Sequence, residues 1–484
     1  MEYKWIALTV TTIGILMVGV DARIVIVGLP QVAAQLHADA EQAIWITQAY
    51  VLTNTLMLLI IGRLGDIFGR VRIYTYGFAI FTVGSALTSL GLDPTQVIIF
   101  RGIQGFGAAL VFTNSIAIVT DAAPKRQLGF FLGINQIAFR AGAMLGLTLS
   151  GLILSFLDWR ALFYINIPIG IFGTIWAKRQ LRESTATDRN AKIDWLGFAA
   201  FTTFLAMLMT GLTLGAYGTS QLNTSYALML LSPVFLALFI AQERRTSNPL
   251  VDLSLFRIKE ITGGLFALFF NIITWTAVLL LLSLQFQLVL NETPLEAGIR
   301  IVPFEIAFLA VGPLSGRLAD RFNRMPFILS GLSLSTVTLF LFSTTDQSTP
   351  YWVLSVYMVM LGLGTGLFVA PNLRSVMASA PERRRGIASA LFTLFLNLGL
   401  TVSLNLAILV MSLTAPYDLI TGVISAVNPM GISMVDKMIF VGSLRNTYLA
   451  FGIVNALAIV PSVLQIRRSP QKTVDKDAVF AMEA

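Results

Sequence analysis

The chain has 484 residues, of which 56% are hydrophobic and 12% are charged. Soluble globular domains carry roughly 25% charged residues, so this composition excludes an ordinary soluble protein. The sequence contains no cysteine, which excludes disulfide bonds and thiolate metal sites. The net charge is +8, but the basic residues gather between long apolar runs, so this charge does not require a nucleic-acid partner.

Long apolar runs, such as 5–20, 44–61, 267–284 and 449–464, hold almost no ionisable groups. Runs of about 18 or more apolar residues are typical of transmembrane helices. The first run continues past Asp21 without a small-residue cleavage site, which favours a retained helix over a signal peptide. In chain order, the runs predict an all-α polytopic membrane protein with fourteen transmembrane helices, at 5–29, 44–62, 73–92, 96–119, 129–153, 161–178, 195–216, 225–242, 261–285, 298–316, 326–344, 352–371, 387–411 and 440–466.

The positions of the basic residues predict the orientation, because loops rich in lysine and arginine stay in the cytoplasm. With the N-terminus inside, most of the 33 basic residues fall in cytoplasmic segments, whereas Arg160, Arg300 and Lys437 fall outside. We therefore expect a multi-pass protein of the cell membrane with both termini in the cytoplasm. The predicted loops are short, except for the outer segment 414–441.

Two predicted cytoplasmic loops share one pattern: "GRLGDIFGRVR" follows the second helix and "GRLADRFNR" follows the tenth. A charged turn alone explains neither the matched spacing nor the matched place in the two halves. Parallel repeats occur in transporters that bind substrate at mid-membrane between the halves. We expect these loops to lock the cytoplasmic side when the halves close there, through Gly62, Asp66, Gly69, Arg70 and Arg72 in the first loop and Gly316, Asp320 and Arg321 in the second.

Several motifs resemble those of the major facilitator superfamily, and within it the fourteen-helix drug:proton antiporter branch. Besides the loop at Gly62, they are "DARIVIVGLP" from Asp21, "RGIQGFGAA" from Arg101, "DWRALFYINIPIG" from Asp158, "DWLGF" from Asp194 and "PLVDLSLFR" from Pro249. The resemblance implies a six-helix bundle at 1–180, a linker with two inserted helices at 181–260, a second six-helix bundle at 261–466 and a cytoplasmic tail at 467–484. It also implies proton-coupled export by a monomer that uses the proton gradient and no cofactor.

Two regions depart from the pattern of that branch. Leu147 stands where the helix 5 signature has proline, and Arg140 is an unexpected charge just before it. Arg23 stands where the branch usually has threonine. The additional arginines keep open an alternative in which the substrates are anionic or zwitterionic.

Charged residues inside the predicted helices are candidate site residues, because each costs roughly 2.5–3.5 kcal/mol at a helix centre. Asp21 and Arg23 are two positions apart, about 200° around a helix, so they do not share a face. Asp21 either carries a proton or contacts a cation, or it is one partner of a structural buried ion pair with Arg101 or Arg140. Arg101 matches a superfamily position tied to proton coupling, and the alternative for this residue is a structural network.

The remaining intramembrane charges have competing interpretations. Arg23 either extends to the outer surface, pairs within the bundle or contacts substrate. Arg140 is expected in a central cavity, where it pairs with Asp21 or with substrate. Glu305 is expected to contact substrate or carry a proton, and the alternative is a local ion pair with Arg300.

Together these observations predict a secondary active transporter in the lipid bilayer that exports amphiphilic, cationic small molecules in exchange for protons. The alternatives are an exporter of anionic or zwitterionic, including lipid-like, molecules and a non-transporting receptor or scaffold on the same fold. There is no GxxxxGK[ST] loop, no metal-ligand cluster and no nucleophile–base constellation in the sequence. We therefore expect neither an enzyme nor an ATP-driven pump.

Overall fold

A computed structural model describes residues 2–124, 128–183, 193–215, 222–246, 249–381, 385–416, 419 and 433–466 of the chain. Within these ranges the secondary structure is helical throughout, with no strand. The N-terminal helix group consists of α1 (Tyr3–Gln35), α2 (Ala40–Phe68), α3 (Arg70–Leu90), α4 (Pro94–Ala122), α5 (Leu128–Phe156), α6 (Ala161–Tyr164) and α7 (Asn166–Gln180).

The remaining helices form a hairpin and a second group. The hairpin consists of α8 (Trp195–Gly215) and α9 (Leu222–Arg245). The C-terminal helix group consists of η1 (Leu253–Arg257), α10 (Lys259–Leu284), η2 (Gln285–Val289), α11 (Pro294–Arg321), α12 (Arg324–Phe342), α13 (Tyr351–Ser379), α14 (Arg385–Ser412), α16 (Met434–Leu457) and α17 (Ile459–Ile466).

Fourteen helical segments in the described ranges are long and apolar enough to cross a membrane, which confirms the predicted number. Two of these segments are interrupted by proline. Pro168 lacks the N–H that would bond to the Tyr164 carbonyl, and the helix breaks between α6 and α7. Pro461 likewise lacks the N–H that would bond to the Leu457 carbonyl, and α16 ends at Leu457 before α17 begins.

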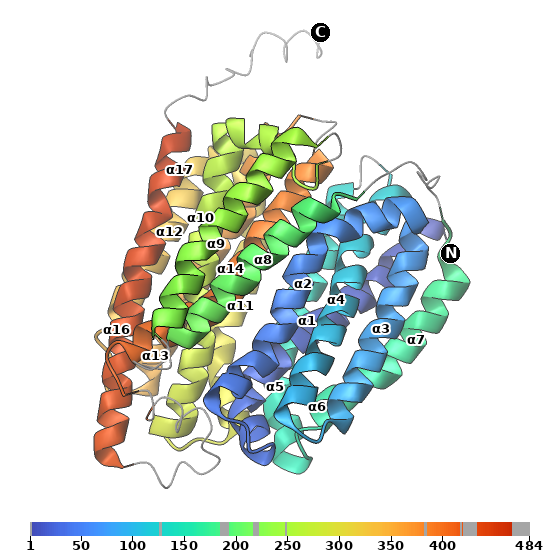
Figure 1. Cartoon of the computed structure of the whole chain (residues 1–484). Coiled ribbons are helices and arrows are strands. Elements are labelled where there is room, and N and C mark those ends of the chain that lie inside the picture. Colours follow the sequence, from blue (N-terminus) through green and yellow to red (C-terminus); the bar gives the residue numbers. More distant parts are fainter. Residues whose placement is uncertain are drawn as a thin grey trace.

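The long helices run side by side in one general direction (Figure 1). The blue-to-cyan helices of the N-terminal group lie on one side, and the yellow-to-red helices of the C-terminal group lie on the other. The most extensive packing joins α1 to α5 and α2 and α3 to α4 in the first group, and α13 to α11 and α12 in the second. The groups meet where α11 packs on α5 and α14 packs on α2.

Glycines bring α1 and α5 into close contact. A Cβ atom at Gly142 would overlap the Leu16 carbonyl, and one at Gly146 would overlap the Val20 carbonyl. Leu147, the position where a proline was expected, is fully buried, and α5 continues through it as one helix without proline. Close helix approach is therefore kept while the proline is absent.

The two helix groups also meet tightly at the end of the molecule that the charge pattern places outside, here called the outer end. A Cβ atom at Gly151 on α5 would overlap the backbone of Leu295 on α11, and one at Gly298 would lie 2.8 Å from the Leu147 carbonyl oxygen. Side chains larger than hydrogen do not fit there. The outer end is therefore closed between α5 and α11.

Several predicted boundaries are wrong by more than a turn. α1 extends from Tyr3 to Gln35 because its apolar pattern continues through Pro30, and α16 begins at Met434, where Ser433 accepts a hydrogen bond from the Asp436 N–H as an N-cap. The predicted tail 467–484 and most of the outer segment 414–441 lie outside the described residues. So do the basic positions 125, 126, 189, 192, 383 and 384.

Candidate functional site

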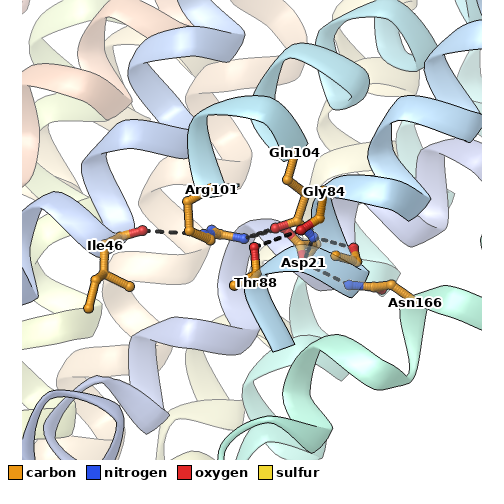
Figure 2. A network of polar contacts seen from close by, with 8 residues as sticks. Asp21, Ile46, Gly84, Thr88, Arg101, Gln104 and Asn166 are labelled. Carbon is orange, nitrogen blue, oxygen red and sulfur yellow. Dashed lines mark hydrogen bonds and ion pairs between the residues drawn. The ribbon is translucent and has the colours of Figure 1, made fainter. Parts of the chain in front are cut away.

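Asp21 lies at the centre of a closed polar network inside the N-terminal helix group (Figure 2). Arg101 Nη1 donates to Asp21 Oδ2 at 2.8 Å, and both side chains are almost completely buried. Gln104 Nε2 and Asn166 Nδ2 each donate to Asp21 Oδ1 at 2.8 Å. Both carboxylate oxygens are therefore occupied by donors from α4 and α7.

Arg101 is also satisfied by neighbours other than Asp21. Its Nη1 donates to Gln104 Oε1 at 2.7 Å, and its Nε donates to the Ile46 carbonyl at 3.2 Å. Its guanidinium carbon lies 4.3 Å from the centre of the Tyr50 ring. Arg101 and Gln104 are three positions apart on α4, which places both on the same face toward Asp21.

The network confirms the predicted alternative of a buried ion pair between Asp21 and Arg101, and it excludes a pair with Arg140. Asn166 was not among the predicted site residues, although it lies within the motif that begins at Asp158. The signal that could have identified it is its place just before the helix-breaking Pro168. A polar side chain there has no reason to be buried unless it has a partner.

A second set of charges surrounds a cavity of about 100 Å³ between the two helix groups. The N-terminal group contributes Arg23 from α1, Gln48 from α2 and Arg140 from α5. The C-terminal group contributes Trp275 from α10 and Glu305 from α11, together with apolar side chains of α14. The cavity therefore collects three of the five predicted intramembrane site residues.

Arg23 points into the cavity and not toward the outer surface. Its side chain is 8% exposed, and its guanidinium carbon lies 5.1 Å from the centre of the Trp275 ring. The alternative that Arg23 extends to the outer surface is wrong, because this residue leaves α1 on the face opposite Asp21 and meets the C-terminal group. Its Nη1 atom is buried without a hydrogen-bond partner.

Arg140 reaches the same cavity from α5 and does not pair with Asp21. Its guanidinium carbon lies 3.9 Å from the centre of the Phe308 ring on α11. Within the described part of the chain, Arg140 makes no hydrogen bond and no ion pair. The expected central position of this residue is confirmed.

Glu305 faces both arginines across the cavity and is 6% exposed. The charges of Arg23 and Arg140 act on its carboxylate, but among the described residues no basic nitrogen lies within 4 Å of it. The predicted alternative of a pair with Arg300 is wrong, because Arg300 Nη2 lies 2.7 Å from Glu292 at the outer end. The cavity thus holds two positive charges and one negative charge.

Three aromatic rings stack beside these charges, and of the three Trp275 lines the cavity. Trp275 stacks on Phe304 and Phe308, with ring centres 5.4 and 6.2 Å apart and interplanar angles of 29° and 28°. Phe304 and Phe308 are themselves within 19° of parallel. Phe304 and Phe308 are almost fully buried, so Trp275 is the ring of this stack that offers apolar surface to a bound molecule.

A neighbouring cavity of about 100 Å³ shares Arg140 and Phe139 with the first. It adds Asn54 from α2 and Asn397 from α14, and it extends toward the end of the molecule that carries the α2–α3 turn, here called the inner end. The second cavity therefore lies on the inner side of the central charges, while α5 and α11 close the outer end.

The first predicted loop forms the turn between α2 and α3 at the inner end. Gly69 adopts a φ of +97°, which favours glycine. Arg70 Nη1 donates to both oxygens of Asp121 at 2.8 Å, and its backbone N–H donates to Glu183 at 2.7 Å. Arg72 is exposed and lies 5.9 Å from the Tyr76 ring.

The second predicted loop is less completely described. Gly316 lies on α11 beside Ala370 of α13. The surroundings of Gly62 and the side chains of Asp66, Asp320 and Arg321 lie outside the described part of the structure. Asp121 and Glu183, which hold Arg70, were not predicted, because they are far from the loop in sequence.

The sequence was compared with protein families of known function. The model described as the Major Facilitator Superfamily matches residues 11–403 and 264–480. The chain belongs to the Major Facilitator Superfamily. It is therefore a transporter embedded in a membrane and not an enzyme, and members of this superfamily move small molecules generally without a cofactor.

Curated relatives within the superfamily include exporters and resistance proteins. The chain is 30% identical to the multidrug resistance protein Stp of Mycobacterium tuberculosis (strain CDC 1551 / Oshkosh) over 411 residues, which cover 82% of this chain and 74% of that protein. It is 27% identical to the tetracenomycin C resistance and export protein of Streptomyces glaucescens over 390 residues, 80% of this chain and 72% of that protein. These relatives agree with the resemblance to the drug-efflux branch.

Another relative has a different substrate in its name. The chain is 29% identical to the riboflavin transporter RibZ of Clostridioides difficile (strain 630) over 407 residues, 82% of this chain and 86% of that protein. Among solved structures, a D-xylose-proton symporter matches with a TM-score of 0.64 at 15% identity, covering 98% of this chain and 99% of that chain. At this identity the structural match supports the fold of the superfamily alone.

Proposed function

We propose that this protein exports amphiphilic small molecules from the cell in exchange for protons, and that the cavity at Arg23, Arg140 and Glu305 is its substrate site. Transport would proceed by alternating access, with the N-terminal and C-terminal helix groups rocking around that cavity. The proposed bundles comprise 1–180 and 261–466, separated by the segment 181–260. The drug-resistance relatives support the direction of transport.

The observation that best supports the proposal is that the Glu305 carboxylate is buried against a cavity and has no direct ion-pairing partner among the described residues. A buried charge without a direct partner is costly, so either a proton or a cationic group of the substrate stabilises it. Because both occupy the same carboxylate, they exclude each other, which is the condition for exchange.

Asp21 has a different proposed role from Glu305. Its two oxygens already accept three hydrogen bonds, and its charge is balanced by Arg101. Releasing Asp21 for proton transfer would leave Arg101 buried without its counterion. We propose that Asp21 and Arg101 hold α1, α4 and α7 together, and that Glu305 exchanges the proton.

The turn at Gly69 is proposed as part of the cytoplasmic lock. Arg70 joins the start of α3 to Asp121 near the end of α4, and Glu183 accepts from backbone N–H groups at the same turn. These contacts stiffen the inner end of the N-terminal group, so that it moves as one unit against the loop at Gly316. Both termini are proposed to lie in the cytoplasm, in a monomer of the cell membrane.

The test uses proteoliposomes with an acidic interior that contains a pH-sensitive dye. Addition of tetraphenylphosphonium to the outside should raise the internal pH in the wild type, because the cation enters in exchange for protons. The Glu305→Gln variant should lose this response, whereas Glu292→Gln, which removes an acid at the outer end, should keep it. A wild-type response that persists in Glu305→Gln would refute the assignment of the exchanging group.

A further inference from the structure

Arg23 and Arg140 differ from Arg101 in how their donors are used. Each guanidinium has five N–H donors, and Arg101 uses three of them in hydrogen bonds to Asp21, Gln104 and the Ile46 carbonyl. In the described part of the chain, Arg23 and Arg140 have no hydrogen-bond acceptor and no carboxylate within 4 Å. Both instead lie over aromatic rings that belong to the opposite helix group.

Aromatic rings stabilise a guanidinium charge but accept few of its hydrogen bonds. Cation–π contacts act on the face of the planar group, while the N–H donors at its edge need acceptors of their own. Arg23 Nη1 and Trp275 Nε1 are both buried without a partner, and both residues line the cavity. A buried donor without an acceptor is costly. The cavity therefore presents unsatisfied donors on the side where Arg23 meets Trp275.

The two arginines also repel each other across the cavity, and Glu305 balances only one of their charges. An acidic group placed between them would supply the missing acceptors and neutralise the remaining charge. Guanidinium groups suit this role because they bind carboxylate, phosphate and sulfonate oxygens with two parallel hydrogen bonds.

We propose that the cavity binds an acidic group of the substrate between Arg23 and Arg140, with an attached aromatic ring system against Trp275 and the leucine side chains of α14 that line the same cavity. This inference rests on the proposed function, since it assigns a class of substrate to the same cavity. It favours the anionic or zwitterionic alternative over purely cationic substrates. A zwitterion satisfies all three charges, because its acidic group faces the arginines and its basic group faces Glu305.

Protonation of Glu305 affects purely acidic ligands differently from ligands that carry a basic group. Arg23 and Arg140 are the charged groups that face Glu305 across the cavity. A ligand with only an acidic group binds more tightly when Glu305 is neutral, because the carboxylate no longer competes for the arginines. A ligand with a basic group displaces the Glu305 proton instead. Only a ligand with a basic group therefore meets the requirement for proton exchange.

The experiment measures binding of three anthracene probes of nearly equal shape to the full chain in phosphatidylcholine nanodiscs. The probes are 9-anthracenecarboxylate, neutral 9-anthracenemethanol and cationic 9-(aminomethyl)anthracene. In the wild type we expect the carboxylate to bind at least tenfold more tightly than the alcohol. Arg23→Gln and Arg140→Gln should each reduce that ratio tenfold or more, and Glu305→Gln should increase it several-fold.

The control variant is Arg160→Gln, which removes a partly exposed arginine that pairs with Asp158 at the outer end. It should leave the ratio unchanged. Because the result is a ratio of affinities within one preparation, it does not depend on the fraction of correctly folded protein. A carboxylate that binds no more tightly than the alcohol, or a ratio that survives both arginine substitutions, would overturn the proposal.

Lipid phosphate has the same chemistry as a free acid and could occupy the site. In nanodiscs with added phosphatidylglycerol, an unchanged ratio supports a free substrate as the occupant. A ratio that falls in wild type but not in Arg140→Gln instead assigns the acidic site to a lipid headgroup. Failure of carboxylate binding with intact cation–proton exchange would refute this inference alone, whereas selective binding without any proton exchange would refute the proposed function.

Discussion

Replacement of Asp21 by asparagine tests whether this residue is structural or carries the transported proton. The substitution leaves Arg101 buried and without its counterion, and it places an amide that donates next to another donor. Breaking a buried ion pair by removing one partner costs roughly 3–5 kcal/mol. In a cooperative unit of 150–250 residues, the size of the N-terminal helix group, this corresponds to a fall in melting temperature of roughly 6–20 °C.

Thermal unfolding in detergent, followed by intrinsic fluorescence of the seven tryptophans, measures this effect. The matched control is Glu305→Gln, which also neutralises a buried intramembrane acid but breaks no ion pair shorter than 4 Å among the described residues. It should lower the melting temperature by less than Asp21→Asn does, because it removes a charge that balances Arg23 and Arg140 only across the cavity and not in a direct ion pair. The double variant Asp21→Asn with Arg101→Gln should recover part of the loss, because the unpaired charge is gone. A melting temperature of Asp21→Asn within 2 °C of wild type, or a double variant less stable than the single one, would refute the reasoning.

Three further predictions concern the outer end. Gly298→Val should separate α5 from α11, because its side chain would overlap the Leu147 carbonyl, whereas Gly312→Val on the same helix meets open space. The sequence contains no cysteine, so a single cysteine introduced in place of Ala22 in the cavity is labelled without background. This cysteine should react several-fold faster with an external membrane-impermeant thiol reagent in Gly298→Val than in Gly312→Val or the parent protein. Equal rates in Gly298→Val and the parent protein would contradict the closed outer end. Burial raises the pKa of Glu292 against the opposing effect of Arg300. The protonated carboxyl group therefore stabilises the fold at low pH, and this stabilisation is lost as the pH rises through the raised pKa. Glu292→Gln should therefore raise the free energy of unfolding slightly at pH 7.5, by about 0–1 kcal/mol, and not at pH 4. Hydrogen bonds from Ser348 and Thr349 lower the pKa of Asp346, so the ionised carboxylate stabilises the fold. Asp346→Asn should therefore lower the melting temperature at pH 7.5 but not at low pH. A change in stability that does not depend on pH, in either variant, would contradict the direction given for that residue's pKa.

The sequence predicted the number of spanning helices and the identity of the intramembrane charges, because both follow from local composition. An apolar run with an aspartate in it is visible without knowledge of any neighbour. The 200° between Asp21 and Arg23 also predicted correctly that they face different surroundings. Family motifs then supplied the fold into which these helices assemble.

The pairing of the charges could not be predicted in the same way. Arg101, Arg140 and Arg300 were all plausible partners for the two acids, and the choice depends on helix rotation and height in the bundle. Arg300 illustrates the difficulty: it lies five positions from Glu305, yet its partner is Glu292 at the outer end. The same holds for Asn166, whose role depends on α7 packing beside α1.

The difference between Asp21 and Glu305 has a consequence for coupling. The partners of Asp21 lie on α4 and α7, in the same helix group as α1, so a rocking motion of the two groups leaves their distances unchanged. The charges that act on Glu305 come from α1 and α5 of the opposite group, so the same motion changes their distances directly. A proton-binding group can drive alternating access only if its affinity for the proton differs between the two conformations. Glu305 meets this condition by its position across the boundary, whereas Asp21 would meet it only if the N-terminal group itself deformed.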